Sequence, residues 1–329
     1  MRAPEHPRSA DPSRVKPGAH PWPDLAGLQL EPTLGTLHLW SQVVGKIRMM
    51  LTPWENHSWH VTLYVTARGL GTGLIPGGRI PFSMEFDLDA GVLILRATDG
   101  AEARVPLGPG SLARFHEAVM AALERIGISV VIDPVPCEIP DALAFQEDRE
   151  ERAYDPVAAR VYWRALVQVH RVFQLFRTRF AGKCSPIHLF WGAFDLAVTR
   201  FSGRTAPAHP GGAPHMPDSV AREAYCQEVS SAGFWPGDGS TGGPCFYSYA
   251  YPPPAGFADA PLAPKTARFD PTLGEYLLSY ADMIAAENPD AALLAFLQST
   301  YEAAANLGGW DRAGLERPDG ALGHPPQGS

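Results

Sequence analysis

The sequence predicts an α+β fold of two related halves, in which antiparallel sheets are covered by helices and a pocket lies at their junction. In some segments apolar residues recur every three or four positions, as in helices, and in shorter segments apolar and polar residues alternate, as in strands. This order of helical and strand patterns recurs along the 329 residues. We expect a flexible lead-in at 1–27 and a flexible tail at 313–329. Residues 28–312 would form one unit, with halves at about 34–135 and 155–310.

The first half begins with a helix at about 34–51, where Leu37, Trp40, Val44 and Ile47 share an apolar face. Residues 60–66 alternate in period two and predict a strand, and the glycine-rich segment 69–78 predicts a turn. The remaining expected elements of this half are strands at 80–88, 92–97 and 129–132 and a helix at 111–125.

The second half begins with a long helix at about 156–180, whose apolar residues recur at helical spacing. A Pro/Gly/His loop is expected at 205–217. Two helices close the fold, with Asn288 as an N-cap and Pro289 in the first helical position. The expected strands are 187–191, 194–201, 225–230 and 245–251.

Composition and charge narrow the classes of partner. The net charge of −8, without a cluster of Lys and Arg, argues against nucleic acid. Every apolar run is shorter than about 18 residues and no signal core is found, so we expect no membrane association and a cytoplasmic location. Scattered cysteines fit buried thiols better than disulfides or a zinc knuckle. No nucleotide-binding motif is found, because the glycines at 69–73 are not followed by a helix.

Faint internal similarity suggests a duplication. Lys46 precedes a His/Trp segment and then 63–66 (LYVT), and Lys183 precedes 187–191 (IHLFW) and then 196–199 (LAVT). Two related halves would form a cleft where they meet, and such junctions are common ligand sites.

Four motifs resemble a bacterial domain family of unknown function over about residues 22–310. They are residues 36–48 (TLHLWSQVVGKIR), 56–70 beginning NHSWHV, 188–204 ending FDLAVTRFSGR, and 228–237 (EVSSAGFWPG). The resemblance implies one undivided unit and no particular activity. A His often precedes the Glu of the last motif in that family, and this chain has Gln227 there, which argues against an obligatory metal ligand at the position.

The candidate catalytic residues are His60, His188, Asp195 and Glu228, because imidazoles and carboxylates can exchange protons near neutral pH. Asp195 stands among apolar residues, so we expect a cationic partner such as Arg200 or Arg204. A divalent metal is an open variant, with His57, His60, His188 and Glu228 as its ligands. The competing interpretation is that these histidines are hydrogen-bonded core residues.

Aromatic and cationic side chains next to these motifs are candidates for binding a substrate. Lys46 shares a helix face with His38 and Gln42, and this stripe is interpreted slightly more readily as a solvated surface than as an anion site. The candidate substrate-binding residues are Trp59, Tyr64, Arg68, Trp191, Arg200, Trp235, Tyr247 and Tyr249.

The leading hypothesis is an enzyme that uses acid–base chemistry on a polar or anionic small molecule, with or without a metal. The alternative is a non-catalytic small-molecule binding protein with the same pocket. A structural or assembly role would follow if the aromatic residues formed an exposed patch. The sequence leaves substrate, cofactor and oligomeric state open.

Overall fold

The computed structural model describes residues 22–28, 30–237 and 241–317. Most of the expected lead-in and tail lies outside these residues. Within them, Trp22 and Leu25 are buried, and the Trp22 indole donates a 2.7 Å hydrogen bond to Asp290. The chain therefore packs from Trp22 onward, several residues earlier than expected.

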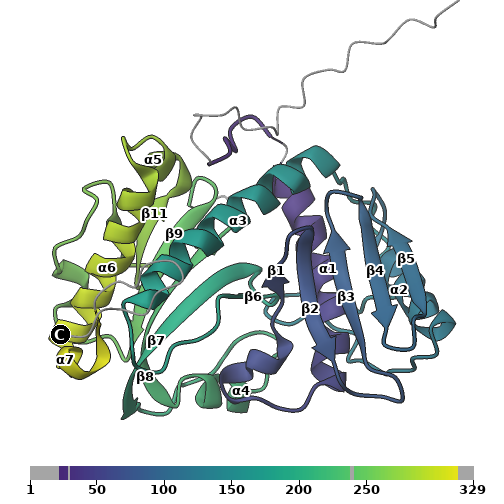
Figure 1. The fold of residues 1–329 in the computed structure, drawn as a ribbon, viewed down its shortest axis with the longest axis horizontal. Helices are drawn as coiled ribbons and strands as arrows, with labels where there is room; N and C mark the ends of the chain where they lie inside the picture. The colour runs from purple at the N-terminus through teal and green to yellow at the C-terminus, as the bar shows by residue number, and fades with distance from the viewer. Residues whose placement is uncertain (1–21, 29, 238–240, 318–329) are drawn as a thin grey trace, which may run out of the picture.

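The first half is a five-stranded antiparallel sheet with a helix on either side of it in the sequence (Figure 1). Strands β1 to β5 follow one another in the sheet in sequence order. The elements are α1 (Leu30–Leu51), the 3-10 segment η1 (Asn56–Val61), β1 (Tyr64–Val65), β2 (Gly69–Ile75), β3 (Phe82–Asp87), β4 (Val92–Ala97), β5 (Glu102–Pro106) and α2 (Leu112–Arg125).

The second half is a six-stranded antiparallel sheet in the order β10-β11-β9-β8-β7-β6. Its strands are β6 (His188–Phe190), β7 (Asp195–Thr205), β8 (Gln227–Trp235), β9 (Cys245–Tyr251), β10 (Arg268–Asp270) and β11 (Glu275–Ser279). Its helices are α3 (Pro156–Thr178), α4 (Asp218–Ala224), η2 (Phe257–Asp259), α5 (Tyr280–Ile284), α6 (Pro289–Leu307) and α7 (Arg312–Leu315). These two sheets with their helices make the chain an α+β protein.

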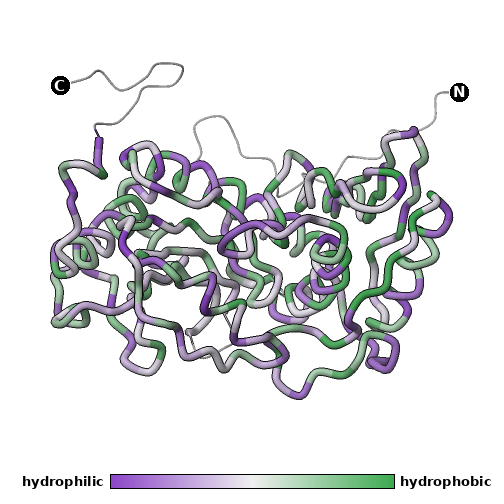
Figure 2. The backbone as a smooth tube through the Cα atoms, turned by 90° about the horizontal axis from the view of Figure 1, so that it is seen from below, coloured by the Kyte–Doolittle hydropathy of each residue, from purple (hydrophilic) through white to green (hydrophobic). Residues whose placement is uncertain are grey.

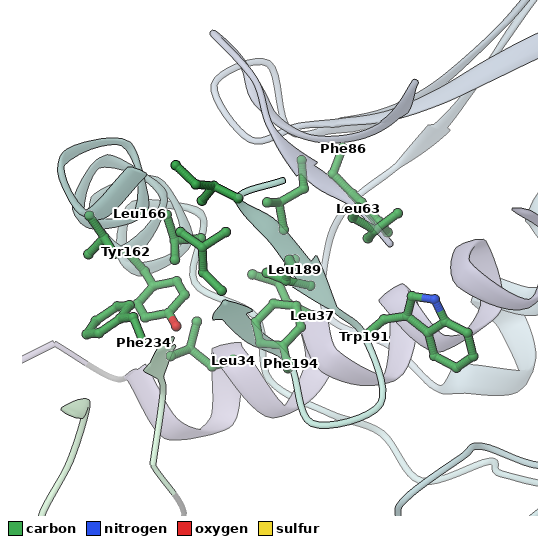
Figure 3. Close-up of a cluster of buried hydrophobic side chains, with 14 of the residues drawn as sticks. Leu34, Leu37, Leu63, Phe86, Tyr162, Leu166, Leu189, Trp191, Phe194 and Phe234 are labelled. Atoms are coloured by element: carbon green, nitrogen blue, oxygen red, sulfur yellow. The ribbon is translucent and has the colours of Figure 1, made fainter. Parts of the chain in front are cut away.

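A backbone bridge joins the edges of the two sheets. Leu63 and Leu189 exchange backbone hydrogen bonds of 2.9 and 2.8 Å, which places β1 beside β6 (Figure 1). Both leucines are fully buried in a single apolar cluster that draws side chains from both halves, including Leu37, Phe86 and Phe234 (Figure 3). Figure 2 shows hydrophilic and hydrophobic residues interspersed along the tube, as elements with one buried side require.

Helices α3 and α6 pack on one face of the six-stranded sheet. The ring of Tyr162 in α3 stacks on Phe234 in β8 at 5.8 Å, and α6 contacts β8 and β9. Asn288 caps α6 by accepting from the Ala291 amide, and Pro289 follows it as predicted. The other face of this sheet lacks a long helix among the described residues, and the candidate site lies on that face.

Several predicted elements were wrong or missing. Residues 60–66 are not one strand, because His57 and Ser58 have positive φ and the chain coils as η1 before β1. The glycine-rich segment 69–78 is mainly strand β2, since its backbone pairs with β3 on one side. Residues 129–132 form no strand. Strands β5, β10 and β11 and helix α4 were not predicted.

None of the helices within the described residues is long and apolar enough to cross a membrane.

Candidate functional site

Alternation along the strands gives the six-stranded sheet two chemically different faces. Leu196, Val198 and Arg200 of β7 point toward the helices, and Asp195, Ala197 and Thr199 point the other way. Antiparallel pairing then sets Ala197 beside Gly233 and Tyr247, and Thr199 beside Ser231 and Tyr249. The face away from α3 and α6 therefore carries a carboxylate, hydroxyls and phenols.

Asp195 is the most enclosed acid on this face, with 7% of its surface exposed. The Tyr247 hydroxyl donates a hydrogen bond to its carboxylate. Burial raises the pKa of Asp195 to about 6, only partly opposed by that bond. The predicted ion pair with Arg200 was wrong, because β7 directs the two side chains to opposite faces of the sheet.

Tyrosines form the wall around Asp195. The rings of Tyr247 and Tyr249 stack at 6.0 Å, and the Tyr249 hydroxyl shares a 2.7 Å hydrogen bond with that of Tyr225. Burial raises the pKa of Tyr225 to about 12, so its phenol stays protonated. At Gly233 a Cβ would stand 2.3 Å from the Tyr247 hydroxyl oxygen, so only glycine lets this phenol cross β8 toward Asp195.

Two glutamates complete the group. The Glu138 carboxylate lies over Gly192, where a Cβ would come within 1.8 Å of its oxygen. Glu138 as a residue is exposed, but the protein around its carboxylate partly desolvates it, and this desolvation together with the charge of Asp195 raises its pKa to about 7. Glu275 in β11 is half-buried, and desolvation followed by the charges of Asp195 and Asp270 raises its pKa to about 7.

A buried polar stripe on α1 holds the loop that carries Glu138. The Gln42 amide nitrogen donates to the carbonyls of Cys137 and Trp191 at 3.0 Å each, and its oxygen accepts from the Cys137 amide at 3.0 Å. The His38 ring bonds the Gly192 carbonyl at 2.8 Å. Lys46, with no exposed surface, pairs with Asp133 at 2.9 Å. The interpretation of this stripe as a solvated surface was wrong.

Near the other end of β7, His57 lies against Lys183. The ring Nδ1 of His57 is 2.8 Å from the Ala224 carbonyl, so it carries the proton, and Nε2 accepts from the Lys183 amine. Lys183 also donates to Gln227 at 3.2 Å and lies over the ring of Trp59. This cluster, which we call the His57–Lys183 pair, is separate from the Asp195 group.

The other predicted catalytic residues do not meet at Asp195. His60 is buried against Trp54, at a ring distance of 4.6 Å. His188 is 1% exposed, lies 2.7 Å from the Pro186 carbonyl through Nδ1, and has a pKa lowered by burial to about 4. Glu228 accepts two hydrogen bonds from Arg204, at 2.9 and 2.6 Å.

The predicted substrate-binding residues are likewise divided. Tyr247 and Tyr249 line the Asp195 group, but Trp191 is buried against Gly45 of α1. Arg200 is fully buried, 3.5 Å from the Phe176 ring centroid and 4.3 Å from that of Tyr301. The rest lie apart: Trp59 under the Lys183 amine, Tyr64 beside Arg48, Arg68 paired with Asp87 and Asp89, and Trp235 at the end of β8.

Within the described part of the chain, no group of three or more His, Cys, Asp or Glu is arranged to hold a metal ion. His57, His60, His188 and Glu228 each have separate contacts and do not converge. A surface hollow at α7 is lined by Arg312, Ala313, Glu316 and Arg317, where Arg312 and Glu316 already pair at 2.6 Å. The Asp195 group has the richer chemistry, because its carboxylates lack such cationic partners.

Sequence reasoning missed Glu138, Glu275 and Tyr225. Glu138 has a positive φ of 62° in an irregular loop, and Glu275 begins a strand that was not predicted. Neither residue carried a periodic signal. Gly192, over which Glu138 lies, was a possible trace of that residue, but a glycine alone does not reveal what lies over it.

The whole folded region belongs to one protein family. The chain matches the Family of unknown function (DUF5996) over residues 22–317, and we conclude that it is a member of that family. The match covers both sheets, which agrees with the resemblance seen in the motifs. No curated protein and no solved structure matches the chain significantly.

Proposed function

We propose that this protein is an enzyme that performs general acid–base chemistry on a polar small molecule at the Asp195 group. Asp195 and Glu138 would exchange protons with the substrate. The Tyr247 hydroxyl would hold the Asp195 carboxylate in place, and Glu275 would bind a donor group of the substrate. The alternative is a binding protein that holds the same molecule without converting it.

The observation that supports this proposal is a set of three interacting carboxylates whose pKa values lie near neutrality. Those of Asp195, Glu138 and Glu275 are raised to about 6, 7 and 7. A carboxylic acid with a pKa close to the working pH can both give and take a proton efficiently. Because Asp195 repels both Glu138 and Glu275, the three groups titrate as a coupled system rather than singly.

The charge of the group favours a neutral or cationic substrate over an anionic one. No ion pair to Asp195, Glu138 or Glu275 is present among the described residues, and Arg200, the expected anion anchor, lies on the opposite face. An amine or a hydroxyl-rich molecule would supply the missing donors, and the phenol rings favour a cation through cation–π contact.

The test is a screen of small amines, amino alcohols and polyols, incubated with the protein and followed by mass spectrometry. Turnover of a compound by the wild type but not by Asp195→Asn or Glu138→Gln supports the enzyme. Glu102→Gln is the matched control, because Glu102 is exposed on β5 in the other sheet. A compound that is retained but unchanged supports the binding protein, and no effect of either variant on turnover or retention refutes both.

Other inferences remain part of this proposal. Four free cysteines and the composition favour a cytoplasmic location. An internal duplication is supported by the coarse order of elements, because each half runs from a long helix through an antiparallel sheet to another helix. The pocket expected at the junction of the halves and the bacterial origin of the chain stay predictions.

A further inference from the structure

The His57–Lys183 pair holds an amine in contact with a neutral imidazole. Because Nδ1 of His57 donates to the Ala224 carbonyl, Nε2 is a free base and points at the Lys183 amine. His57 itself is 4% exposed and is fixed further by its amide, which donates to Glu223 at 2.8 Å. The acceptor for a lysine proton is therefore built in and rigid.

Lys183 remains reachable from solvent, whereas Lys46 does not. The side chain is half-buried and lies over the rings of Phe201 at 4.7 Å and Trp59 at 5.7 Å. Lys46, by contrast, is fully buried in its ion pair. Phe201 is buried, at 2% exposed, whereas Trp59 is half-buried, so a flat molecule that reaches the amine would stack on the open part of Trp59.

We propose that Lys183 and His57 form a second reactive site, in which the Lys183 amine adds to the carbonyl carbon of a small aromatic aldehyde while His57 carries the proton. This site is distinct from the Asp195 group. Phe201 and Asp195 are six residues apart on β7, about 20 Å at roughly 3.3 Å per residue. The proposal therefore does not depend on the proposed function.

The step balances without a further reactant. His57 Nε2 takes a proton from the Lys183 ammonium, and the freed amine forms a C–N bond to the carbonyl carbon and passes one of its two protons to the carbonyl oxygen, which becomes a hydroxyl. The imidazolium returns its proton to that hydroxyl, which leaves as water, so ammonium and aldehyde become protonated imine and water.

The surroundings make the Lys183 ammonium easier to deprotonate. Desolvation lowers the pKa of Lys183, although the nearby charges of Cys226 and Glu223 oppose this shift. Burial also lowers the pKa of His57, and the charge of Lys183 lowers it further. Glu223 and the aromatic rings disfavour an anionic carbonyl compound, so an uncharged aromatic aldehyde fits better than a keto acid.

The chain has four lysines, Lys16, Lys46, Lys183 and Lys265, which makes a direct test simple. The full-length protein is incubated with benzaldehyde and sodium cyanoborohydride, which reduces an imine to a stable benzylamine, and modification is read for each lysine by peptide mass spectrometry. Lys265 is exposed and serves as the internal control.

We expect Lys183 to be modified several-fold faster than Lys265, and His57→Gln to remove that advantage. Glyoxylate in place of benzaldehyde should modify Lys183 more slowly. Equal modification of Lys183 and Lys265 in the wild type would overturn the proposal, and this comparison requires no variant to fold. A Lys183 rate unchanged by His57→Gln, in a variant with wild-type circular dichroism, would overturn the role of His57.

Discussion

Replacing Asp195 with Asn should stabilise the protein at neutral pH and abolish its activity. The pKa of Asp195 rises from 3.8 to about 6 on folding. At 1.36 kcal/mol per pKa unit, keeping the carboxylate ionised in the fold costs about 3 kcal/mol above pH 6. Asn is neutral, has nearly the same shape and can still accept from the Tyr247 hydroxyl, so Asp195→Asn removes this cost.

The stability difference between Asp195→Asn and wild type should depend on pH with a definite sign. A carboxyl whose pKa is raised in the fold does not lower the free energy of unfolding below its unfolded pKa, where it is neutral in both states. The free energy of unfolding then falls as the pH rises from the unfolded pKa through the folded pKa. The stability gained by Asp195→Asn should therefore approach about 3 kcal/mol at pH 8 and shrink toward pH 4. Urea unfolding of wild type and variant between these pH values measures it.

Asp87 provides a matched control with the opposite sign. It is as buried as Asp195, at 5% exposed, but the Ala90 amide and Arg68 hold its pKa below the ordinary value despite desolvation. Asp87→Asn should destabilise the protein at neutral pH, and the loss should fade as the pH drops through the folded pKa. If Asp195→Asn instead destabilises at pH 8 as Asp87→Asn does, the carboxylate is stabilised in the fold and the reasoning fails.

Three further predictions concern other residues. Gly192→Ala should displace the Glu138 carboxylate and remove turnover in the mass-spectrometric screen, whereas Gly108→Ala, which has open space at its Cβ, should not. Burial of neutral His188 should cost the wild type about 3 kcal/mol of stability as the pH falls from 6.5 toward 4, and His188→Gln, which cannot be protonated, should lose less stability over that range; urea-unfolding curves of wild type and variant with the same pH dependence would contradict it. Arg200→Ala should lower the free energy of unfolding by about 2 kcal/mol or more, from lost packing and cation–π contact, without changing substrate binding in a thermal-shift assay.

The parts of the fold that the sequence predicted well are those with strong periodicity. Helices α2 and α3 begin within a residue of their predicted starts, because a capping Ser111 and the pair Asp155–Pro156 mark them. Strand β9 matches its predicted bounds, 245–251. Strand β2 was missed because its glycines lack the side chains that produce an alternating pattern, although its backbone pairs normally.

The candidate site was predicted only where a motif lay on a strand. Asp195, Tyr247 and Tyr249 came from strand alternation and meet on one face. Glu138 reaches them from a loop held by Gln42, more than 90 residues earlier, and such long-range contacts leave no mark in a single sequence. Arg200 was wrongly predicted to bind substrate for a related reason. Alternation along a strand shows which residues share a face, but only the neighbouring layers show which face is covered by helices.

The central claim is that carboxylates of the Asp195 group titrate near neutral pH. Carbon-13 NMR of protein labelled at the aspartate carboxyl carbons measures this directly, with the Asp195 signal identified by its absence in Asp195→Asn. We expect that signal to titrate with an apparent pKa near 6, with a further inflection as Glu138 and Glu275 ionise around pH 7. A signal that titrates at or below the ordinary value of 3.8 would contradict the account.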